Sequence, residues 1–193
     1  MIKRSKLSLF IFLTLILSYI PFGLSYSTAK AASTENPDTG YNVGQFAADF
    51  STIDTDGKSF QLSEMRDKKP VYLIFWATWC KTCKHEMPTF IDLYERHNSD
   101  LEIVSINVDS LSFWSSLKKS NQRVKEYVDQ YQIPYRVILD DEEKLIKQFN
   151  VQGTPTQLLI DKEGVIRKRY PLFTEKTERL IEKVVAENSS NQF

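Results

Sequence analysis

The pattern of apolar and polar residues along the chain predicts an α/β domain. Five mostly apolar stretches have the length of strands, and the first contains six consecutive uncharged residues, as in a strand buried on both faces. A Lys-Glu-Gly turn is expected to join the last two stretches as an antiparallel pair. The predicted strands are Val71–Trp76, Leu101–Val108, Arg136–Asp140, Thr156–Asp161 and Val165–Tyr170.

Segments with apolar residues three to four positions apart lie between and after these strands, and they predict helices. The first of them contains Pro88, which removes one backbone hydrogen bond and is expected to kink the helix. Its core face would consist of Met87, Phe90, Ile91 and Tyr94. This order of elements favours one mixed sheet with helices on both faces. The predicted helices are Cys80 to about His97, Val124–Tyr131, Glu142–Phe149 and Thr174–Glu187.

A shorter alternating segment precedes the main sheet. Gln45–Thr55 and Lys58–Leu62 flank the pair Asp56-Gly57, a favoured hairpin turn, so they predict a small antiparallel ribbon. A short helical turn is expected to begin at Ser63 and Glu64. The expected organisation is therefore a leader at 1–31, a polar linker at 32–42, a folded domain at 43–187 and a flexible tail at 188–193.

The first 31 residues have the pattern of a secretory signal peptide. A basic start, Met1–Lys6, precedes the uncharged apolar run Leu7–Leu24, and Ala29-Lys30-Ala31 offers a small-x-small cleavage site. An uncleaved membrane anchor is the alternative, because the 18 residues of the run approach the length that spans a bilayer. Both interpretations put the domain outside the cytoplasm, either secreted or tethered to the outer face of the cytoplasmic membrane, where disulfides persist.

The charge of the domain argues against a nucleic-acid partner. The whole chain carries 25 basic and 25 acidic residues, and four of the basic ones lie in the leader. Without residues 1–31, there are 21 basic against 25 acidic side chains, a net charge of −4. A mildly acidic domain binds nucleic acids and polyphosphates poorly.

Cys80 and Cys83, in a C-x-x-C spacing, carry the candidate chemistry. The strand Val71–Trp76 leads directly into them, so Cys80 is expected at the N-terminus of the following helix. There, unpaired N–H groups and the helix dipole favour an anion, and Cys80 should ionise more easily than a free thiol. Cys83 would lie on the same helical face and could close a disulfide with Cys80. A C-x-x-C beside a strand–helix pattern indicates redox chemistry.

Two other interpretations of the cysteine pair are weaker. A structural disulfide across two residues would close a very short loop and add little stability. A structural zinc site needs four ligands, and only His85 and His97 remain as nitrogen ligands, with His85 too close in sequence to complete the site easily.

The sequence F-W-A-T-W-C-K-T-C-K, followed some seventy positions later by Gly153-Thr154-Pro155-Thr156, resembles the thioredoxin superfamily. The resemblance is closest to the extracytoplasmic TlpA/ResA-like thiol–disulfide oxidoreductases and covers roughly Val43–Glu187, with Ala48 where proline is more usual. It implies a thioredoxin-like fold with an N-terminal β-hairpin extension and a cis bond before Pro155 that faces the cysteines. It also implies that Thr154 offers its backbone to a substrate chain in strand-like pairing.

Glu86 is the candidate for proton handling. Cytoplasmic thioredoxins place a buried Asp in the strand six residues before the first cysteine, where this chain has Ile74. Glu86 lies one helical turn after Cys83 and matches an active-site Glu of the ResA-like proteins. Partial burial would raise its pKa and let it exchange protons with Cys83. An exposed helical Glu with no such role is the alternative interpretation.

These features predict a thiol–disulfide oxidoreductase without cofactor or metal. Cys80 would attack a substrate disulfide and Cys83 would resolve the mixed disulfide, with Trp79 lining the site and Trp76 either lining it or belonging to the core. The resemblance implies a reductive role on exported proteins, for instance apocytochrome c, and the protein is expected to be a monomer. The resemblance also implies re-reduction by a membrane thiol-electron carrier of the CcdA/DsbD type.

Three other functions are alternatives to this one. An oxidative role stays open, because Lys81 would stabilise the Cys80 thiolate and Thr82 stands where many relatives have proline. A peroxiredoxin-type peroxidase needs Ser or Thr three residues before its cysteine and Pro seven before, positions that hold Ala77 and Leu73. A non-enzymatic copper or thiol carrier is the third alternative, and the argument against it is that the sequence lacks further Met, His and Cys ligands.

Overall fold

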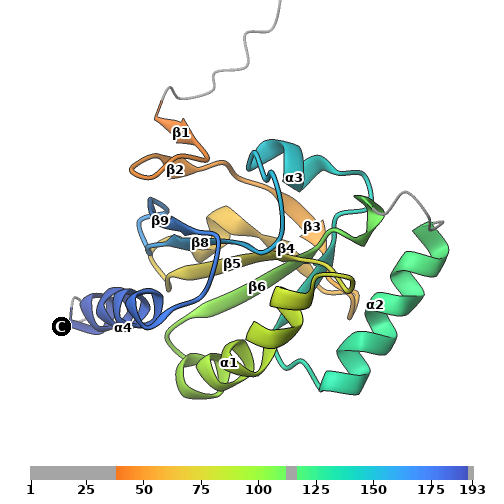
Figure 1. Cartoon of the computed structure of the whole chain (residues 1–193). Coiled ribbons are helices and arrows are strands. Elements are labelled where there is room, and N and C mark those ends of the chain that lie inside the picture. The colour runs from red at the N-terminus through yellow and green to blue at the C-terminus, as the bar shows by residue number, and fades with distance from the viewer. Residues whose placement is uncertain (1–37, 112–116, 191–193) are drawn as a thin grey trace, which may run out of the picture. The chain divides into compact units, whose positions relative to one another are not determined.

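The computed structural model describes residues 38–111 and 117–190, all within one compact unit (Figure 1). The predicted leader at 1–31 and most of the linker lie outside these residues. Within the described part of the chain, no helix has both the length and the apolar character needed to cross a membrane.

A five-stranded mixed sheet forms the centre of the domain, in the order β7-β6-β5-β8-β9. The middle strand β5 is buried along its whole length, as its uncharged sequence predicts. It pairs in parallel with β6 and antiparallel with β8. The outer pairs are β6 with β7, in parallel, and β8 with β9, as the expected hairpin. The strands are β5 (Val71–Trp76), β6 (Glu102–Asn107), β7 (Arg136–Leu139), β8 (Thr156–Ile160) and β9 (Ile166–Tyr170).

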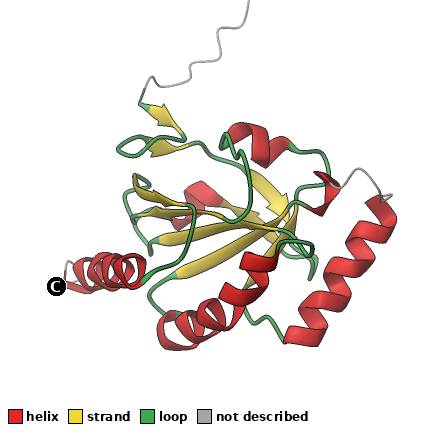
Figure 2. Cartoon of the chain, in the orientation of Figure 1, coloured by secondary structure: helices red, strands yellow, loops and turns green. Residues whose placement is uncertain are grey.

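Helices cover both faces of this sheet, as predicted (Figures 1 and 2). On one face, Tyr72 of β5 packs against Phe90 of α1, and Trp76 packs against Tyr127 of α2. On the other face, Phe75 packs against Phe149, just after α3. The helices are α1 (Lys81–His97), α2 (Leu117–Tyr131), α3 (Lys144–Gln148) and α4 (Glu175–Ser190), with short 3₁₀ turns η1 (Leu62–Met65) and η2 (Asp109–Leu111).

The predicted N-terminal ribbon is present as β3 (Ser51–Ile53) and β4 (Ser59–Gln61). Gly57 in the turn between them has a φ of +81°, a conformation that glycine adopts at little cost. A second strand pair, however, includes residues before the predicted boundary at 43. β1 (Thr39–Gly40), inside the expected linker 32–42, pairs in parallel with β2 (Phe46–Ala47), because the intervening turn brings the two backbones together.

Other boundaries also differ from the prediction. α2 begins seven residues before the predicted start at Val124. These seven residues lack the apolar spacing of a core-facing helix, but they include no Gly or Pro and can therefore be helical. α4 runs to Ser190, three residues into the expected flexible tail 188–193. Asn188 is buried there and its Nδ2 donates to the carbonyl oxygen of Lys68 at 3.4 Å. This docking holds the end of the helix against the domain.

The core face of α1 also differs in part from the prediction. Met87, Phe90 and Leu93 are buried, whereas Ile91 and Tyr94 are half-buried at its margin. Pro88 lies inside α1 as predicted, and the helix changes direction along its length (Figure 1). The bend follows from the backbone hydrogen bond that proline cannot make.

Candidate active site

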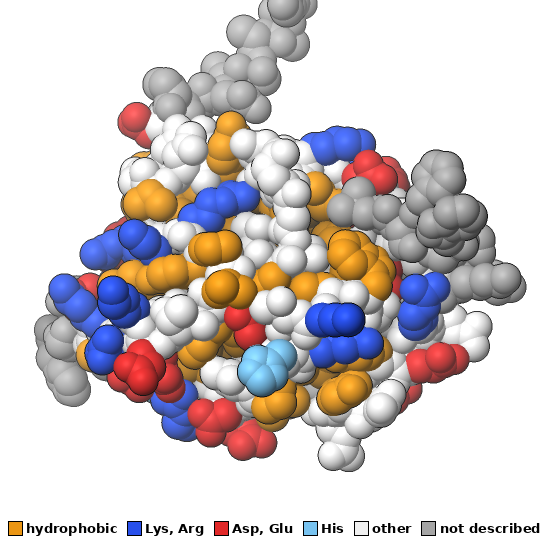
Figure 3. Space-filling model, viewed as in Figure 1, with side chains coloured by type: hydrophobic (Ala, Val, Ile, Leu, Met, Phe, Trp, Pro, Cys, Tyr) orange, Lys and Arg blue, Asp and Glu red, His pale blue; other side chains and the backbone are white. Residues whose placement is uncertain are grey.

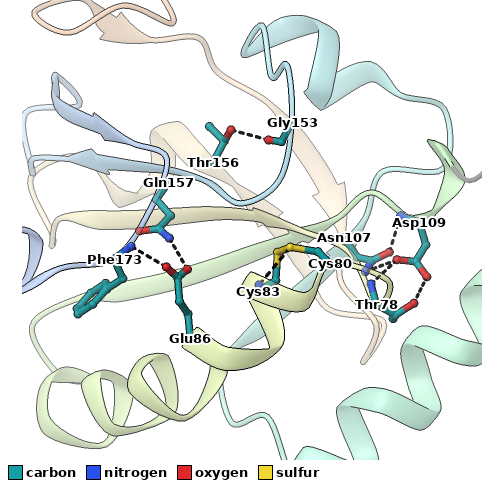
Figure 4. The surroundings of a disulfide bond; sticks show 10 residues. All are labelled: Thr78, Cys80, Cys83, Glu86, Asn107, Asp109, Gly153, Thr156, Gln157 and Phe173. Atoms are coloured by element: carbon teal, nitrogen blue, oxygen red, sulfur yellow. Dashed lines mark hydrogen bonds between the residues drawn. A yellow bond between two sulfur atoms is a disulfide. The ribbon is translucent and has the colours of Figure 1, made fainter.

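The two cysteines lie at the start of α1, where the buried strand β5 ends and a short loop turns into the helix. Cys80 is the N-cap residue, and the backbone N–H of Cys83 donates to Cys80 Sγ at 3.1 Å. A disulfide joins the two side chains (Figure 4). Cys80 is 6% exposed and Cys83 1%, so Cys80 is the sulfur that a partner reaches more easily. This is the geometry that the C-x-x-C spacing predicts.

This position suits a thiolate when the disulfide is open. The sulfur of an N-cap residue meets the N–H groups that have no partner inside the helix, and the helix dipole stabilises a negative charge there. The exposed Lys81 adds a positive charge next in sequence to Cys80. The arrangement can therefore supply a nucleophilic sulfur near neutral pH.

Glu86 lies on the same side of α1 as the cysteines and is buried, with 8% of its surface exposed. Its Oε1 accepts from the backbone N–H of Phe173 and its Oε2 from Nε2 of Gln157, each at 2.8 Å (Figure 4). Burial raises the pKa of Glu86, and these two hydrogen bonds partly oppose that effect. The predicted burial and the raised pKa are confirmed, and the interpretation as an exposed surface Glu is wrong.

The partners of Glu86 did not emerge from the sequence. Gln157 is fully buried on β8, where its Oε1 also accepts from the hydroxyl of Tyr72 at 2.6 Å. The ring of Phe173 packs against Tyr72 and Phe90, which holds the loop before α4 in place. One signal could have revealed them: Gln157 is a lone amide side chain inside an apolar strand, and a buried polar group requires hydrogen-bond partners.

A second carboxylate supports the loop that precedes Cys80. Asp109, buried at the start of η2 just after β6, accepts from both the backbone N–H of Thr78, at 2.7 Å, and the Thr78 hydroxyl (Figure 4). Asn107 Nδ2 donates to the same carboxylate at 3.2 Å, and Arg123 Nη1 lies 3.6 Å away. Sequence reasoning missed Asp109, although an acidic residue directly after a buried strand next to β5 was a usable signal.

The peptide bond between Thr154 and Pro155 is cis, as the resemblance implied. Thr156 follows it as the first residue of β8 and pairs with Phe75 of β5. Because β5 leads into the cysteines directly after Trp76, this register brings the proline loop to the same end of the sheet as Cys80. Thr156 Oγ1 donates to the carbonyl oxygen of Gly153 at 2.7 Å and closes the loop (Figure 4).

The two tryptophans near the cysteines differ in exposure. Trp76 is 1% exposed and packs against Tyr127, with ring centroids 5.3 Å apart, so it belongs to the core. Trp79 is 49% exposed, next in sequence to Cys80, and Leu172 in the loop before α4 is 47% exposed. Apolar side chains gather across the middle of the face shown in Figure 3, with charged side chains around them. Such a face can bind an unfolded or extended chain through apolar contacts.

Comparisons with known proteins show which family the chain is similar to. A family model described as the AhpC/TSA family matches residues 43–169. Thioredoxin-like protein YneN of Bacillus subtilis is 31% identical over 157 residues, 81% of this chain and 84% of that protein. Thiol-disulfide oxidoreductase ResA of Bacillus cereus is 30% identical over 151 residues, 78% of this chain and 73% of that protein.

A solved structure gives the same result. The crystal structure of the exposed lipoprotein thioredoxin Etrx1 of Streptococcus pneumoniae has a TM-score of 0.59 at 30% identity, covering 72% of this chain and 99% of that chain. The fold is thus thioredoxin-like, as the sequence predicted. The chain belongs to the AhpC/TSA family and is a thioredoxin-like thiol–disulfide oxidoreductase.

Proposed function

We propose that this enzyme acts outside the cytoplasm and reduces disulfides in exported proteins, for instance apocytochrome c. The observation that carries the proposal is the cysteine pair at the start of α1 with the buried Glu86 one turn behind it. The basic start, apolar run and Ala-Lys-Ala site of residues 1–31 support the location, with secretion and membrane tethering both open. The similar protein Etrx1, described as an exposed lipoprotein, supports it as well.

Cys80 is the attacking sulfur in this proposal. Its thiolate attacks a substrate disulfide, forms a mixed disulfide and releases one substrate sulfur as a thiolate. Cys83 then attacks Cys80 within the mixed disulfide, which releases the second substrate sulfur and forms the Cys80–Cys83 disulfide. The substrate gains two electrons and the enzyme loses two. The greater exposure of Cys80 supports this order.

Glu86 handles the proton of Cys83. The second thiol must lose its proton before it attacks, and a carboxylate one helical turn away can accept it. A carboxyl group whose pKa is raised toward neutrality by burial does this better than one with an ordinary pKa. In the reverse direction, the same carboxylic acid returns the proton to the thiolate.

Substrate contacts come from Thr154, Pro155 and Trp79. The backbone of Thr154 lies beside the start of β8 and can pair with an extended substrate chain. The half-exposed side chain of Trp79, the residue before Cys80, offers apolar area to a substrate. Substrates are therefore unfolded or extended segments with a disulfide, and no nucleic acid is involved.

A membrane thiol-electron carrier of the CcdA/DsbD type is the proposed reductant, because a disulfide left after each turnover needs two electrons to reopen. The enzyme needs no cofactor in this proposal, since both half-reactions are exchanges between sulfur atoms. We expect it to work as a monomer.

The reduction potential of the Cys80–Cys83 couple tests the direction of electron flow. The potential is measured by equilibration with glutathione or dithiothreitol buffers and alkylation of the free thiols. A value near that of thioredoxin, about −270 mV, supports a reductase, whereas a value near that of DsbA, about −120 mV, would assign the oxidative role. N-terminal sequencing of the native protein tests the location: a start at Ala32 means cleavage, and an intact Met1 in the membrane fraction means an anchor.

A further inference from the structure

A chain of hydrogen bonds connects the interior of the sheet to the Glu86 carboxylate. The hydroxyl of Tyr72 donates to Gln157 Oε1 at 2.6 Å, and Gln157 Nε2 donates to Glu86 Oε2 at 2.8 Å. Tyr72 and Gln157 are both fully buried. Each bond joins residues more than 70 positions apart in sequence, so the chain exists only in the folded sheet.

Strand register explains why this glutamine reaches α1. Gln157 on β8 pairs with Ile74 on β5, and Tyr72 lies two residues from Ile74 on the same face of the sheet. Cross-strand diagonal neighbours are within reach of long side chains. The Gln157 amide therefore lies on the face that α1 covers, with the Tyr72 hydroxyl on one side and Glu86 of the helix on the other. Figure 4 shows the Gln157 side chain directed toward Glu86.

The Tyr72 hydroxyl favours one orientation of the Gln157 amide, because only in that orientation does its buried proton have an acceptor. A carbonyl oxygen can only accept, so at the Tyr72 end the phenol is the donor and the NH₂ group is left for Glu86. Burial raises the pKa of Tyr72 well above its ordinary value, and the phenol therefore keeps its proton over the working pH range. In the opposite orientation, the Gln157 carbonyl would face Glu86, which suits a protonated carboxylic acid but repels a carboxylate.

We propose that Gln157 and Tyr72 are positioning residues of the exchange reaction, which hold Glu86 in place and in its ionised form, ready to accept a proton from Cys83. This inference rests on the proposed role of Glu86. Burial works against the charge of Glu86 and raises its pKa, while the bonds from Phe173 and Gln157 favour the charge. Without these donors the carboxyl would stay protonated to higher pH.

The other groups around Glu86 come from several elements. On α1 itself lie the cysteine pair and His85, whose charge when protonated lowers the pKa of Glu86. The loop before α4 supplies the N–H of Phe173. On β9, Tyr170 pairs with Gln157 and acts electrostatically on Tyr72. Replacing Gln157 or Tyr72 leaves all of these groups in place, so their effect can be measured separately.

Three variants test the proposal: Gln157→Leu, Tyr72→Phe and the double variant. The carboxyl carbon of Glu86 is followed by ¹³C NMR from pH 4 to 9 in the oxidised protein, and its signal is assigned with Glu86→Gln. Loss of a hydrogen bond to a charged group should raise the midpoint for Gln157→Leu by about one pH unit, a tenfold change in the acid constant. The acid limb of kcat/KM for a disulfide peptide should move by the same amount.

Tyr72→Phe should raise the Glu86 midpoint by less, because the amide keeps its NH₂ group but is free to turn over. The double variant should match Gln157→Leu alone, since Tyr72 acts only through the amide. Tyr72→Phe keeps the volume of the core, so the test survives if Gln157→Leu does not fold.

Two matched controls should leave the Glu86 midpoint unchanged. Gln122→Leu removes an exposed amide that donates to Glu126 at 2.9 Å. Tyr135→Phe removes a buried hydroxyl that donates to Met87 Sδ. If the titration midpoint of Glu86 is the same in the three test variants as in the wild type, while Glu86→Gln slows exchange, the positioning role is wrong and the proposed function stands. If Glu86→Gln exchanges at the wild-type rate, the role of Glu86 fails, and the positioning role in catalysis fails with it.

Discussion

Replacing Glu86 with Gln is the sharpest test of the proposed proton transfer, because the network around it can adapt to the change. A Gln side chain at position 86 can still accept from the N–H of Phe173. Its NH₂ group would face that of Gln157, but the Gln157 amide can turn over and accept from it. The Tyr72 hydroxyl then accepts from Gln157 instead of donating.

The cost of this rearrangement is small. All the amide groups keep partners, and only the hydroxyl proton of Tyr72 loses its acceptor, so the free energy of unfolding should fall by about 1 kcal/mol. Removal of the buried charge should offset part of this loss in stability, because burying an ionised carboxylate costs free energy. Urea unfolding should therefore show a variant that is folded and nearly as stable as the wild type.

The rate of disulfide exchange should change much more than the free energy of unfolding. Without the acid–base group, exchange near neutral pH should slow by about 10²-fold, the lower end of the usual range, because thiols exchange protons readily. The Cys80 thiolate should form at lower pH, since the negative charge that opposes it is gone. Thiolate absorbance followed against pH, with insulin or a disulfide peptide as substrate, measures both effects. An unchanged titration with an unchanged rate would refute the reasoning.

Stability against pH gives an independent check on the same residue. The pKa of Glu86 is higher in the folded protein than its ordinary value, so between the two values the folded state binds more protons than the unfolded state. The free energy of unfolding of the wild type should consequently fall as the pH rises through this window. The Glu86→Gln variant should lack that component, and a wild-type slope retained in the variant would contradict the assignment.

Three further outcomes are expected. Cys80→Ser should abolish exchange, whereas Cys83→Ser should accumulate mixed disulfides that mass spectrometry detects; faster alkylation of Cys83 than of Cys80 in the reduced protein would reverse their roles. Asp109→Ala should lower the free energy of unfolding by about 2–4 kcal/mol in urea, because the N–H and hydroxyl of Thr78 lose their buried acceptor; a loss below about 0.5 kcal/mol would remove Asp109 from the supporting network. Trp79→Ala should raise KM about tenfold while stability changes by less than about 0.5 kcal/mol, since the ring is half-exposed, and an unchanged KM would exclude it from substrate binding.

The fold could be predicted from the sequence because local patterns determine most of it. The six uncharged residues of β5 marked the central strand, and Asp56-Gly57 marked the hairpin turn. The predicted boundaries were wrong where tertiary contacts extend a helix beyond the residues whose local pattern predicts it. Asn188 is an example, since it is held in α4 by a hydrogen bond to a loop 120 residues away.

The candidate site was predictable only in part. Cys80 caps α1, and Cys83 and Glu86 follow in its first two turns, so their spacing alone predicts that they lie close together. Gln157 and Phe173, by contrast, come from β8 and from the loop before α4, and only the strand register brings them to Glu86. Asp109 reaches the cysteine loop by the same route, through the pairing of β5 with β6. A single sequence carries no record of such pairings.

The distance in sequence between the cysteines and the partners of Glu86 affects how the enzyme is made. Cys80 and Cys83 are three residues apart, but Gln157 and Phe173 follow Glu86 by 71 and 87 residues. At roughly 5–20 residues per second, the cysteines precede Phe173 by about 5–20 s during synthesis. For that interval the nascent chain carries a thiol pair without the folded site around it. The site around the cysteines is therefore complete only after β8 and the loop before α4 have been made and folded.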